Sequence, residues 1–331
     1  MPATLNILLP LFGLIAAGYG GRRLSLLDGN AASVLNAFVV WLALPALLFD
    51  ITAHSSAAAL WQPGFVGAFG LATALTFGAV FLARWRAGRR MADASVEAIA
   101  ASYSNTGYVG LPLCLLVFGR GSQVEATIAT LIVVCVLFSV AIVLIELGLQ
   151  AGGRSRGARV AAALWRSLKH PLVLSPLLGA AWSGSGVALP GVAHTFLQLL
   201  GQAATPCALV ALGVFLADCP VRGEHRRTSW VLVAVKLLAL PALTWVLAHQ
   251  VFRLTPRSAD AAVLLAALPT GTGPFMLAEF YRRDVGVSST TTLVSTVLSL
   301  GTLAVLLTHF AVTRRQPTGT VHGFELERPI K

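Results

Sequence analysis

Charged residues are scarce in this 331-residue chain: Lys, Arg, Asp and Glu together make up 11% of it, whereas hydrophobic residues make up 56%. A typical soluble domain has about 25% charged residues, and a soluble core of this size could not bury so much apolar surface. The shortage of charge therefore excludes an ordinary soluble protein. It indicates an all-α polytopic membrane protein with roughly ten spans, each of about 20 apolar residues.

Reactive side chains are also few. The four cysteines lie in or at the ends of apolar stretches and form no CxxC pair, so we interpret them as small buried hydrophobes. The histidines near span ends (His54, His170, His194 and His249) are scattered along the chain, which argues against a metal site. There is no nucleophile–base pair, HExxH motif or phosphate-binding loop, so the sequence predicts neither an enzyme nor a bound cofactor.

The net charge of +11 comes from basic residues in short loops between apolar runs. That distribution follows the positive-inside rule and argues against a nucleic-acid partner. The loops after even-numbered spans contain only Arg120, Arg253 and Arg257, so we expect the other loops to be cytoplasmic and both termini to lie outside. The predicted spans are 3–20, 32–52, 64–83, 95–118, 126–149, 169–184, 190–217, 229–251, 260–281 and 287–311, followed by a flexible polar tail at 313–331.

Residues 1–150 and 151–312 align as two repeats when the sequence is shifted by about 163 positions. Glu97 then falls on Asp260, and Gly110 falls on Gly273. Five spans per repeat is an odd number, so the two halves are predicted to be inverted, as in many secondary transporters. Chance similarity between apolar helices is the alternative, but the coincidence of helix-breaking residues favours the repeat.

Spans four and nine each contain a cluster of helix-breaking residues, NTGYVGLP and PTGTGP. Proline lacks an N–H and glycine lets the backbone unwind, and hydrocarbon offers no partner for the freed groups. The N-terminus of each second half-helix would attract an anion. The sequence therefore predicts a substrate site rather than two simple kinks. Its candidate residues are Asn105, Thr106, Gly107, Tyr108, Gly110, Pro112, Pro269, Thr270, Gly271, Thr272, Gly273 and Pro274.

Three ionisable residues are candidates for charge pairing or coupling. Lys236 is the basic residue well inside a span; it either meets a substrate carboxylate or snorkels to the interface. Glu97 and Asp260 open the two broken spans and either lie at the interface or couple transport to protons. Unwound carbonyls could instead bind sodium, so H⁺ and Na⁺ are the candidate coupling ions.

The stretch SNTGYVGLPL resembles the Asn-x-Gly-aromatic-x-Gly-x-Pro signature of the auxin efflux carrier family, within the bile/arsenite/riboflavin transporter superfamily. HPLVLSPLLG, ATPCALVALG, VKLLALPAL and LPTGTGPFMLAEFY continue the resemblance, which covers nearly all of residues 1–312. It implies ten helices in two inverted five-helix repeats, with discontinuous spans four and nine crossing at their prolines. It also implies a homodimer, and relatives that include plant auxin exporters and bacterial permeases for malate or malonate.

Two features qualify the resemblance. Many relatives carry Pro-Thr-Ala-x-Asn-x-Phe in span nine, whereas this chain has Gly273 at the Asn position. The short loop at 150–168 is similar to that of bacterial members, so we expect an inner-membrane protein.

The sequence thus predicts a secondary active transporter of a small mono- or dicarboxylate, in contact with membrane lipid and working by alternating access around the two breaks. Two alternatives stay open: a sodium- or proton-coupled symporter of a neutral or amphipathic solute, and a non-transporting receptor on a carrier fold.

Overall fold

The computed structural model describes residues 2–149, 171–218 and 226–315, together with residues 157, 165 and 169. Within these ranges the regular elements are helices, and the only β-type pairing is an isolated bridge between Ser104 and Thr270. The all-helical class is therefore confirmed. Most of the predicted loop at 150–168, and residues 316–331 of the predicted tail, lie outside the described residues.

Each predicted span coincides with one helix or with consecutive helical segments. The first half contains α1 (Pro2–Arg23), α2 (Ala31–Phe38), η1 (Val39–Ala43), α3 (Leu44–Ala53), α4 (Ala57–Leu60), α5 (Pro63–Arg86), α6 (Met91–Ser102), η2 (Thr106–Gly110), α7 (Leu111–Phe118), η3 (Arg120–Ser122), α8 (Gln123–Leu131), η4 (Ile132–Leu137) and α9 (Phe138–Gly148). The second half contains α11 (Pro171–Gly184), α12 (Gly191–Gln202), α13 (Ala204–Asp218), α14 (Arg226–Ala234), η6 (Val235–Ala239), α15 (Leu240–Val246), η7 (Leu247–Val251), α16 (Pro256–Ala267), α17 (Gly273–Phe280) and α18 (Val285–Arg315).

Six helical stretches of the described chain are long and apolar enough to cross a membrane. They are Ala31–Ala53, Ala58–Arg86, Arg120–Gly148, Gly191–Asp218, Arg227–Val251 and Val285–Ala311. The other predicted spans correspond to α1, α11 and the two broken helices, α6–α7 and α16–α17. Helix α18 ends at Arg315, so the first three residues of the predicted tail are helical.

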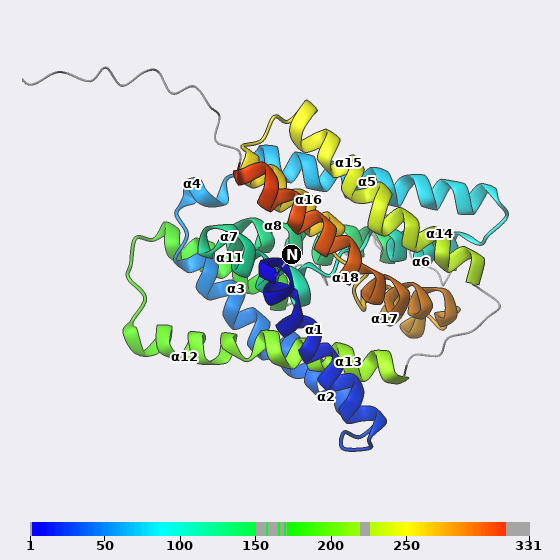
Figure 1. Cartoon of the computed structure of the whole chain (residues 1–331), viewed down its shortest axis with the longest axis horizontal. Helices are drawn as coiled ribbons and strands as arrows, with labels where there is room; N and C mark the ends of the chain where they lie inside the picture. Colours follow the sequence, from blue (N-terminus) through cyan, green and yellow to red (C-terminus); the bar gives the residue numbers. More distant parts are fainter. Residues whose placement is uncertain are drawn as a thin grey trace, which may run out of the picture.

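The two halves of the sequence are interleaved. Helix α1 packs along α13, and α3 packs along α11, so each pair joins one helix from either half. The α1–α13 contact is close: a Cβ placed on Gly18 or Gly213 would overlap the backbone of the facing helix. In Figure 1, α1, α2, α12 and α13 gather in the lower part of the view, while α5, α14, α15 and α16 lie in the upper part.

Candidate functional site

The two helix breaks lie directly against each other. Ser104 and Thr270 form an antiparallel bridge between the unwound stretches. The backbone N–H of Asn105 donates a hydrogen bond to the Pro269 carbonyl at 2.9 Å, and the backbone N–H of Gly271 donates to the Tyr103 carbonyl at 3.1 Å. Each break therefore supplies partners for backbone groups that the other break releases. This mutual pairing explains how two interrupted helices can persist inside an apolar protein.

A cavity of about 200 Å³ opens beside the first break. Among the predicted site residues, Asn105, Thr106, Gly107 and Tyr108 line it from the first break, and Thr272 and Gly273 line it from the second. The remaining lining residues are mostly apolar: Asn36, Val40, Leu44, Tyr103, Ser104, Thr130, Val134, Phe138, Ile142, Leu172 and Met276. None of these described lining residues is charged, so any anion that binds here meets neutral donors.

Two polar atoms in the first break are buried without a hydrogen-bond partner among the described residues. They are Nδ2 of Asn105 and Oγ1 of Thr106. The first-turn amides of Gly107 and Tyr108 also have no acceptor earlier in their own helix. A buried donor without an acceptor costs about 1–3 kcal/mol. These groups are therefore poised to bind something that accepts hydrogen bonds.

The Tyr108 hydroxyl donates a hydrogen bond to Oδ1 of Asn36, which also lines the cavity. Sequence reasoning did not single out Asn36. The signal was present, because Asn36 is an amide inside the apolar run SVLNAFVV and a polar side chain in such a run needs a partner. Asn36 fixes Tyr108 at the cavity wall.

The second break is satisfied by the protein itself. The backbone N–H of Thr270 donates to Oγ of Ser295 at 3.0 Å, and Oγ1 of Thr270 donates to the Ala100 carbonyl at 2.9 Å. Oγ1 of Thr292 donates to the Gly271 carbonyl at 3.3 Å. Thr270 and Gly271 do not line the cavity, and neither do Pro269 and Pro274.

The remaining predicted residues shape the break without lining the cavity. A Cβ on Gly110 would lie 2.9 Å from Cδ2 of Leu265 and Cδ1 of Leu268, so Gly110 allows the second half of span four to approach α16 closely. Pro274 lies in the first turn of α17, where a missing N–H breaks no intrahelical bond, so it starts that half-helix. Pro112 instead lies inside the continuous helical stretch Thr106–Phe118, at the junction of η2 and α7.

Lys236 is fully buried, and its ammonium donates a hydrogen bond to the Ala266 carbonyl at 2.7 Å. Ala266 lies in the last turn of α16, where carbonyl groups carry partial negative charge. Lys236 thus does not snorkel to an interface, and it does not line the cavity either. This hydrogen bond supports the helix end that leads into the second break.

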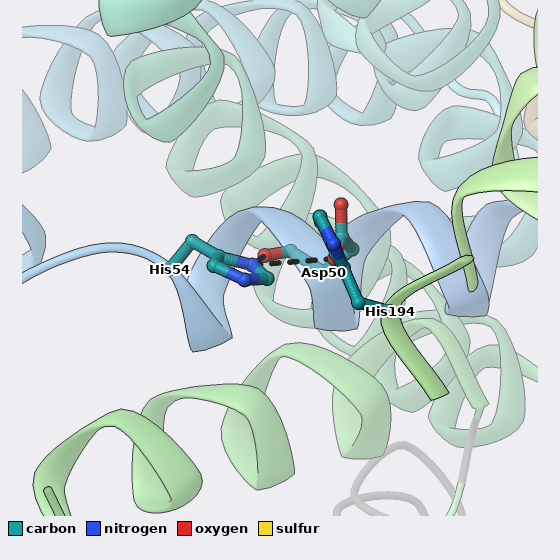
Figure 2. A group of neighbouring side chains, drawn as sticks. All are labelled: Asp50, His54 and His194. Atoms are coloured by element: carbon teal, nitrogen blue, oxygen red, sulfur yellow. Dashed lines mark hydrogen bonds and ion pairs between the residues drawn. The ribbon is translucent and has the colours of Figure 1, made fainter. Parts of the chain in front are cut away.

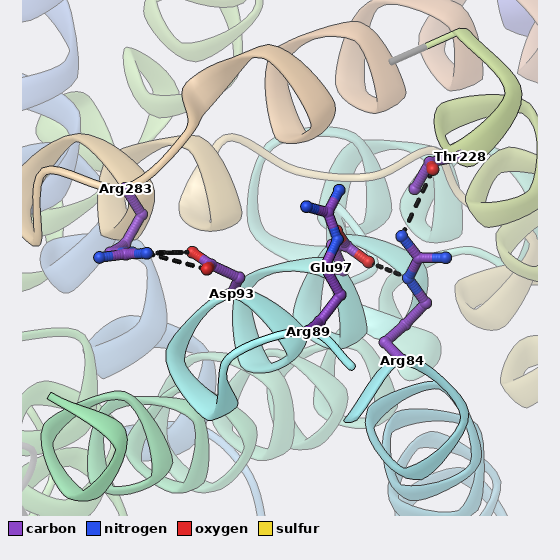
Figure 3. A network of polar contacts seen from close by, with 6 residues as sticks. All are labelled: Arg84, Arg89, Asp93, Glu97, Thr228 and Arg283. Atoms are coloured by element: carbon purple, nitrogen blue, oxygen red, sulfur yellow. Dashed lines mark hydrogen bonds and ion pairs between the residues drawn. The ribbon is translucent and has the colours of Figure 1, made fainter. Parts of the chain in front are cut away.

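Glu97 is buried with only 3% of its surface exposed, rather than interfacial. Its carboxylate accepts a hydrogen bond from Arg84 and lies 3.2 Å from Nε of Arg89 (Figure 3). Nearby, Arg283 binds Asp93 through two hydrogen bonds of 2.8 Å. These ion pairs connect the end of α5, the loop after it and the turn after α17 to α6. Asp260 is half-buried in α16, away from the cavity.

Sequence reasoning missed one buried carboxylate and one pair of neighbouring histidines. Glu125 is 5% exposed and accepts a hydrogen bond of 2.6 Å from Ser258. The expectation that the histidines are scattered is wrong for His54 and His194, whose ring centroids lie 4.6 Å apart. Because α3 and α12 pack together, residues that are distant in sequence become neighbours. His170 lies outside the described residues.

An apolar all-helical chain with a cavity beside two paired helix breaks has the features of a membrane transporter. A family model described as "Membrane transport protein" matches residues 4–307. The chain belongs to this membrane transport family, which includes the auxin efflux carriers.

Individual relatives agree with this assignment. The chain is 33% identical over 313 residues to a "Putative malonate transporter" of Rhizobium meliloti, covering 93% of this chain and 96% of the relative. It is 26% identical to an "Uncharacterized transporter" of Methanothermobacter thermautotrophicus, covering 88% and 93%. A match to auxin efflux carrier component 3a of Oryza sativa is 30% identical but covers 41% of this chain and 23% of the plant protein.

Proposed function

We propose that this protein is a secondary active carrier of a small organic anion, bound in the cavity at the first break. The observation that carries the proposal is the pair of buried, unpartnered atoms, Nδ2 of Asn105 and Oγ1 of Thr106, among the described residues. A substrate carboxylate would accept hydrogen bonds from both, and from the first-turn amides of η2. The partial positive charge of this helix end favours an anion over a neutral solute.

The rest of the cavity suits a short carbon skeleton. Val134, Phe138 and Ile142 give one apolar wall. A short mono- or dicarboxylate is small enough for a cavity of about 200 Å³. The relative described as a malonate transporter supports a small dicarboxylate as the first substrate to test.

We propose alternating access as the mechanism, in two inverted five-helix repeats whose broken helices cross. The reciprocal packing of α1 on α13 and α3 on α11 supports this arrangement. The ion pairs of Arg84 and Arg283 would close the cytoplasmic side. A second cavity of about 750 Å³, lined by Leu111 and Pro112 among others, would lead to the outside. In this proposal the protein lies in the bacterial inner membrane as a homodimer with both termini outside.

The proposal is tested by counterflow in proteoliposomes with radiolabelled malonate, malate, succinate and indole-3-acetate, because counterflow needs no coupling gradient. We expect one anion to exchange, and Asn105→Ala to weaken its apparent affinity by about 10- to 100-fold, since a hydrogen bond to a charged group contributes about 1.5–3 kcal/mol. Ser95→Ala is the matched control: Ser95 is buried on α6 and lies outside the cavity.

The outcomes separate the carrier from its site. Exchange that Asn105→Ala reduces and Ser95→Ala preserves supports both. Equal exchange in wild type and Asn105→Ala would leave the carrier standing and refute the site. Ligand-dependent thermal stabilisation without any exchange would favour a receptor.

A further inference from the structure

A cluster of three metal-ligating side chains lies outside the proposed substrate cavity. Asp50 belongs to α3, His54 follows the last turn of the same helix, and His194 belongs to α12. One ligand atom from each residue lies within 4.8 Å of the other two. Figure 2 shows both imidazole rings facing the carboxylate of Asp50.

Two of the three separations between the ligand atoms match a tetrahedral metal site. Oδ1 of Asp50 lies 3.2 Å from Nδ1 of His54 and 3.5 Å from Nε2 of His194. Zinc binds histidine nitrogen and carboxylate oxygen at about 2.0–2.2 Å, which places neighbouring ligand atoms of a tetrahedron roughly 3.3–3.5 Å apart. The two separations from Oδ1 fit this geometry, and the third, between the two imidazole nitrogens, is within 4.8 Å.

The same atoms do not form an ordinary hydrogen-bonded cluster. Oδ1 of Asp50 is buried and accepts no hydrogen bond from the described residues, although two imidazole nitrogens lie close to it. Nδ1 of His54 lies 2.9 Å from the backbone carbonyl of Asp50, so coordination would exchange this contact for the ion. A metal would thus bind Oδ1, whose contacts with the two imidazoles are ion-pair distances rather than hydrogen bonds.

We propose that Asp50, His54 and His194 form a binding site for Zn²⁺ or a similar divalent transition metal, linking α3 to α12. Two neutral imidazoles and one carboxylate suit such a metal and leave its fourth position open. That position would face the cavity of about 750 Å³ that these three residues help to line. Bound metal would fasten a helix of the first half of the chain to a helix of the second.

The test is metal binding to the purified full-length protein, prepared without a polyhistidine tag. Isothermal titration with Zn²⁺, and the visible absorption of Co²⁺ in the same site, should give one ion per chain with tetrahedral character. Zn²⁺ should also raise Tm, because a ligand that binds only the folded state stabilises it. We expect His194→Ala to weaken binding by at least about tenfold, the range seen when a metal site loses supporting interactions.

His249→Ala is the matched control, because His249 lies on η7, outside the cluster, with its ring on Trp245. It should bind metal as wild type does. His54→Gln and His194→Gln are conservative replacements that test for misfolding. Their binding results count only if the metal-free variants have the same Tm as wild type. Absence of binding to wild type, or unchanged binding in Asp50→Asn, His54→Gln or His194→Gln, would refute the three-ligand site.

Discussion

The two helix breaks look alike in sequence but differ in what satisfies them. In the first break, Asn105 and Thr106 keep buried polar atoms without partners among the described residues, and both face a cavity. In the second break, Thr270 and Gly271 are held by Ser295, Ala100 and Thr292. The same kind of motif therefore supplies binding groups at one position and a fixed support at the other.

The difference follows from which neighbours each break has. Helix α18 passes the second break and presents a row of hydroxyl side chains to it, including Ser295 and Thr292. The first break instead faces Leu44 and Thr130 across the cavity, and Gly107 would keep ordinary van der Waals contact with both even if it carried a Cβ. A helix break becomes a binding site where the neighbouring helices leave a cavity beside it and leave its hydrogen-bond donors without partners.

The largest expected effect comes from Lys236, whose side chain binds the helix end that leads into the second break. Replacing it as Lys236→Met keeps the side-chain length but removes the ammonium that binds the Ala266 carbonyl. Since such a charged hydrogen bond contributes about 1.5–3 kcal/mol, we expect counterflow to fall about 10- to 100-fold as the break loses its geometry. Initial exchange rates in proteoliposomes measure this.

Lys169→Met is the control, because Lys169 is an exposed lysine whose ammonium lies over the ring of Trp165. It should leave exchange unchanged.

We also expect wild-type uptake to be independent of a sodium gradient, because Lys236 already places a cation at the end of α16. Normal exchange in a folded Lys236→Met protein, or sodium-driven uptake in wild type, would contradict this role.

The presence of a break in spans four and nine was predictable from sequence, because glycine and proline favour an interruption. The first break was placed too late: the helix is interrupted at 103–105, and 106–112 of the predicted break is helical, whereas the second interruption at 268–272 overlaps the predicted 269–274. Their asymmetry was not predictable, since it depends on partners far along the chain, such as Ser295 for Thr270 and Asn36 for Tyr108. Amphipathic patterns do not encode such pairings.

Other long-range features escaped sequence reasoning for the same reason. His54 and His194 meet only because α3 and α12 pack together. Burial of Glu97 depends on Arg84 and Arg89 folding back over α6. Lys236 was recognised as an intramembrane cation, but the carbonyl that it binds belongs to a different span. Sequence thus anticipated which residues are unusual, and the fold decided what each of them contacts.

A smaller effect is expected when the second break is made to resemble the first. Gly273 lines the cavity from the second break, and a Cβ there would lie 2.7 Å from Cζ of Tyr103. We expect Gly273→Asn to destabilise the protein by about 1–3 kcal/mol through overpacking. The measurement is Tm in detergent.

The ring of Tyr103 is the proposed cause, so shortening it should reverse the effect. Tyr103→Ala combined with Gly273→Asn should recover most of the lost stability, and Tyr103→Ala alone serves as the control for the cavity that it creates. If the double variant is less stable than the sum of the two single variants predicts, the clash with Tyr103 is not the cause.

The smallest expected effects come from matched threonine substitutions, one in each break. Thr106→Val removes a buried hydroxyl that has no partner among the described residues, so Tm should stay the same or rise, while KM for the exchanged anion increases about three- to tenfold. Thr270→Val removes the hydrogen bond to the Ala100 carbonyl, so unfolding should become easier by about 0.5–1.5 kcal/mol with KM unchanged. Thr106→Val should therefore raise KM without lowering Tm, whereas Thr270→Val should lower Tm without changing KM. If both variants lose stability alike, or both raise KM alike, the division of roles between the two breaks is wrong.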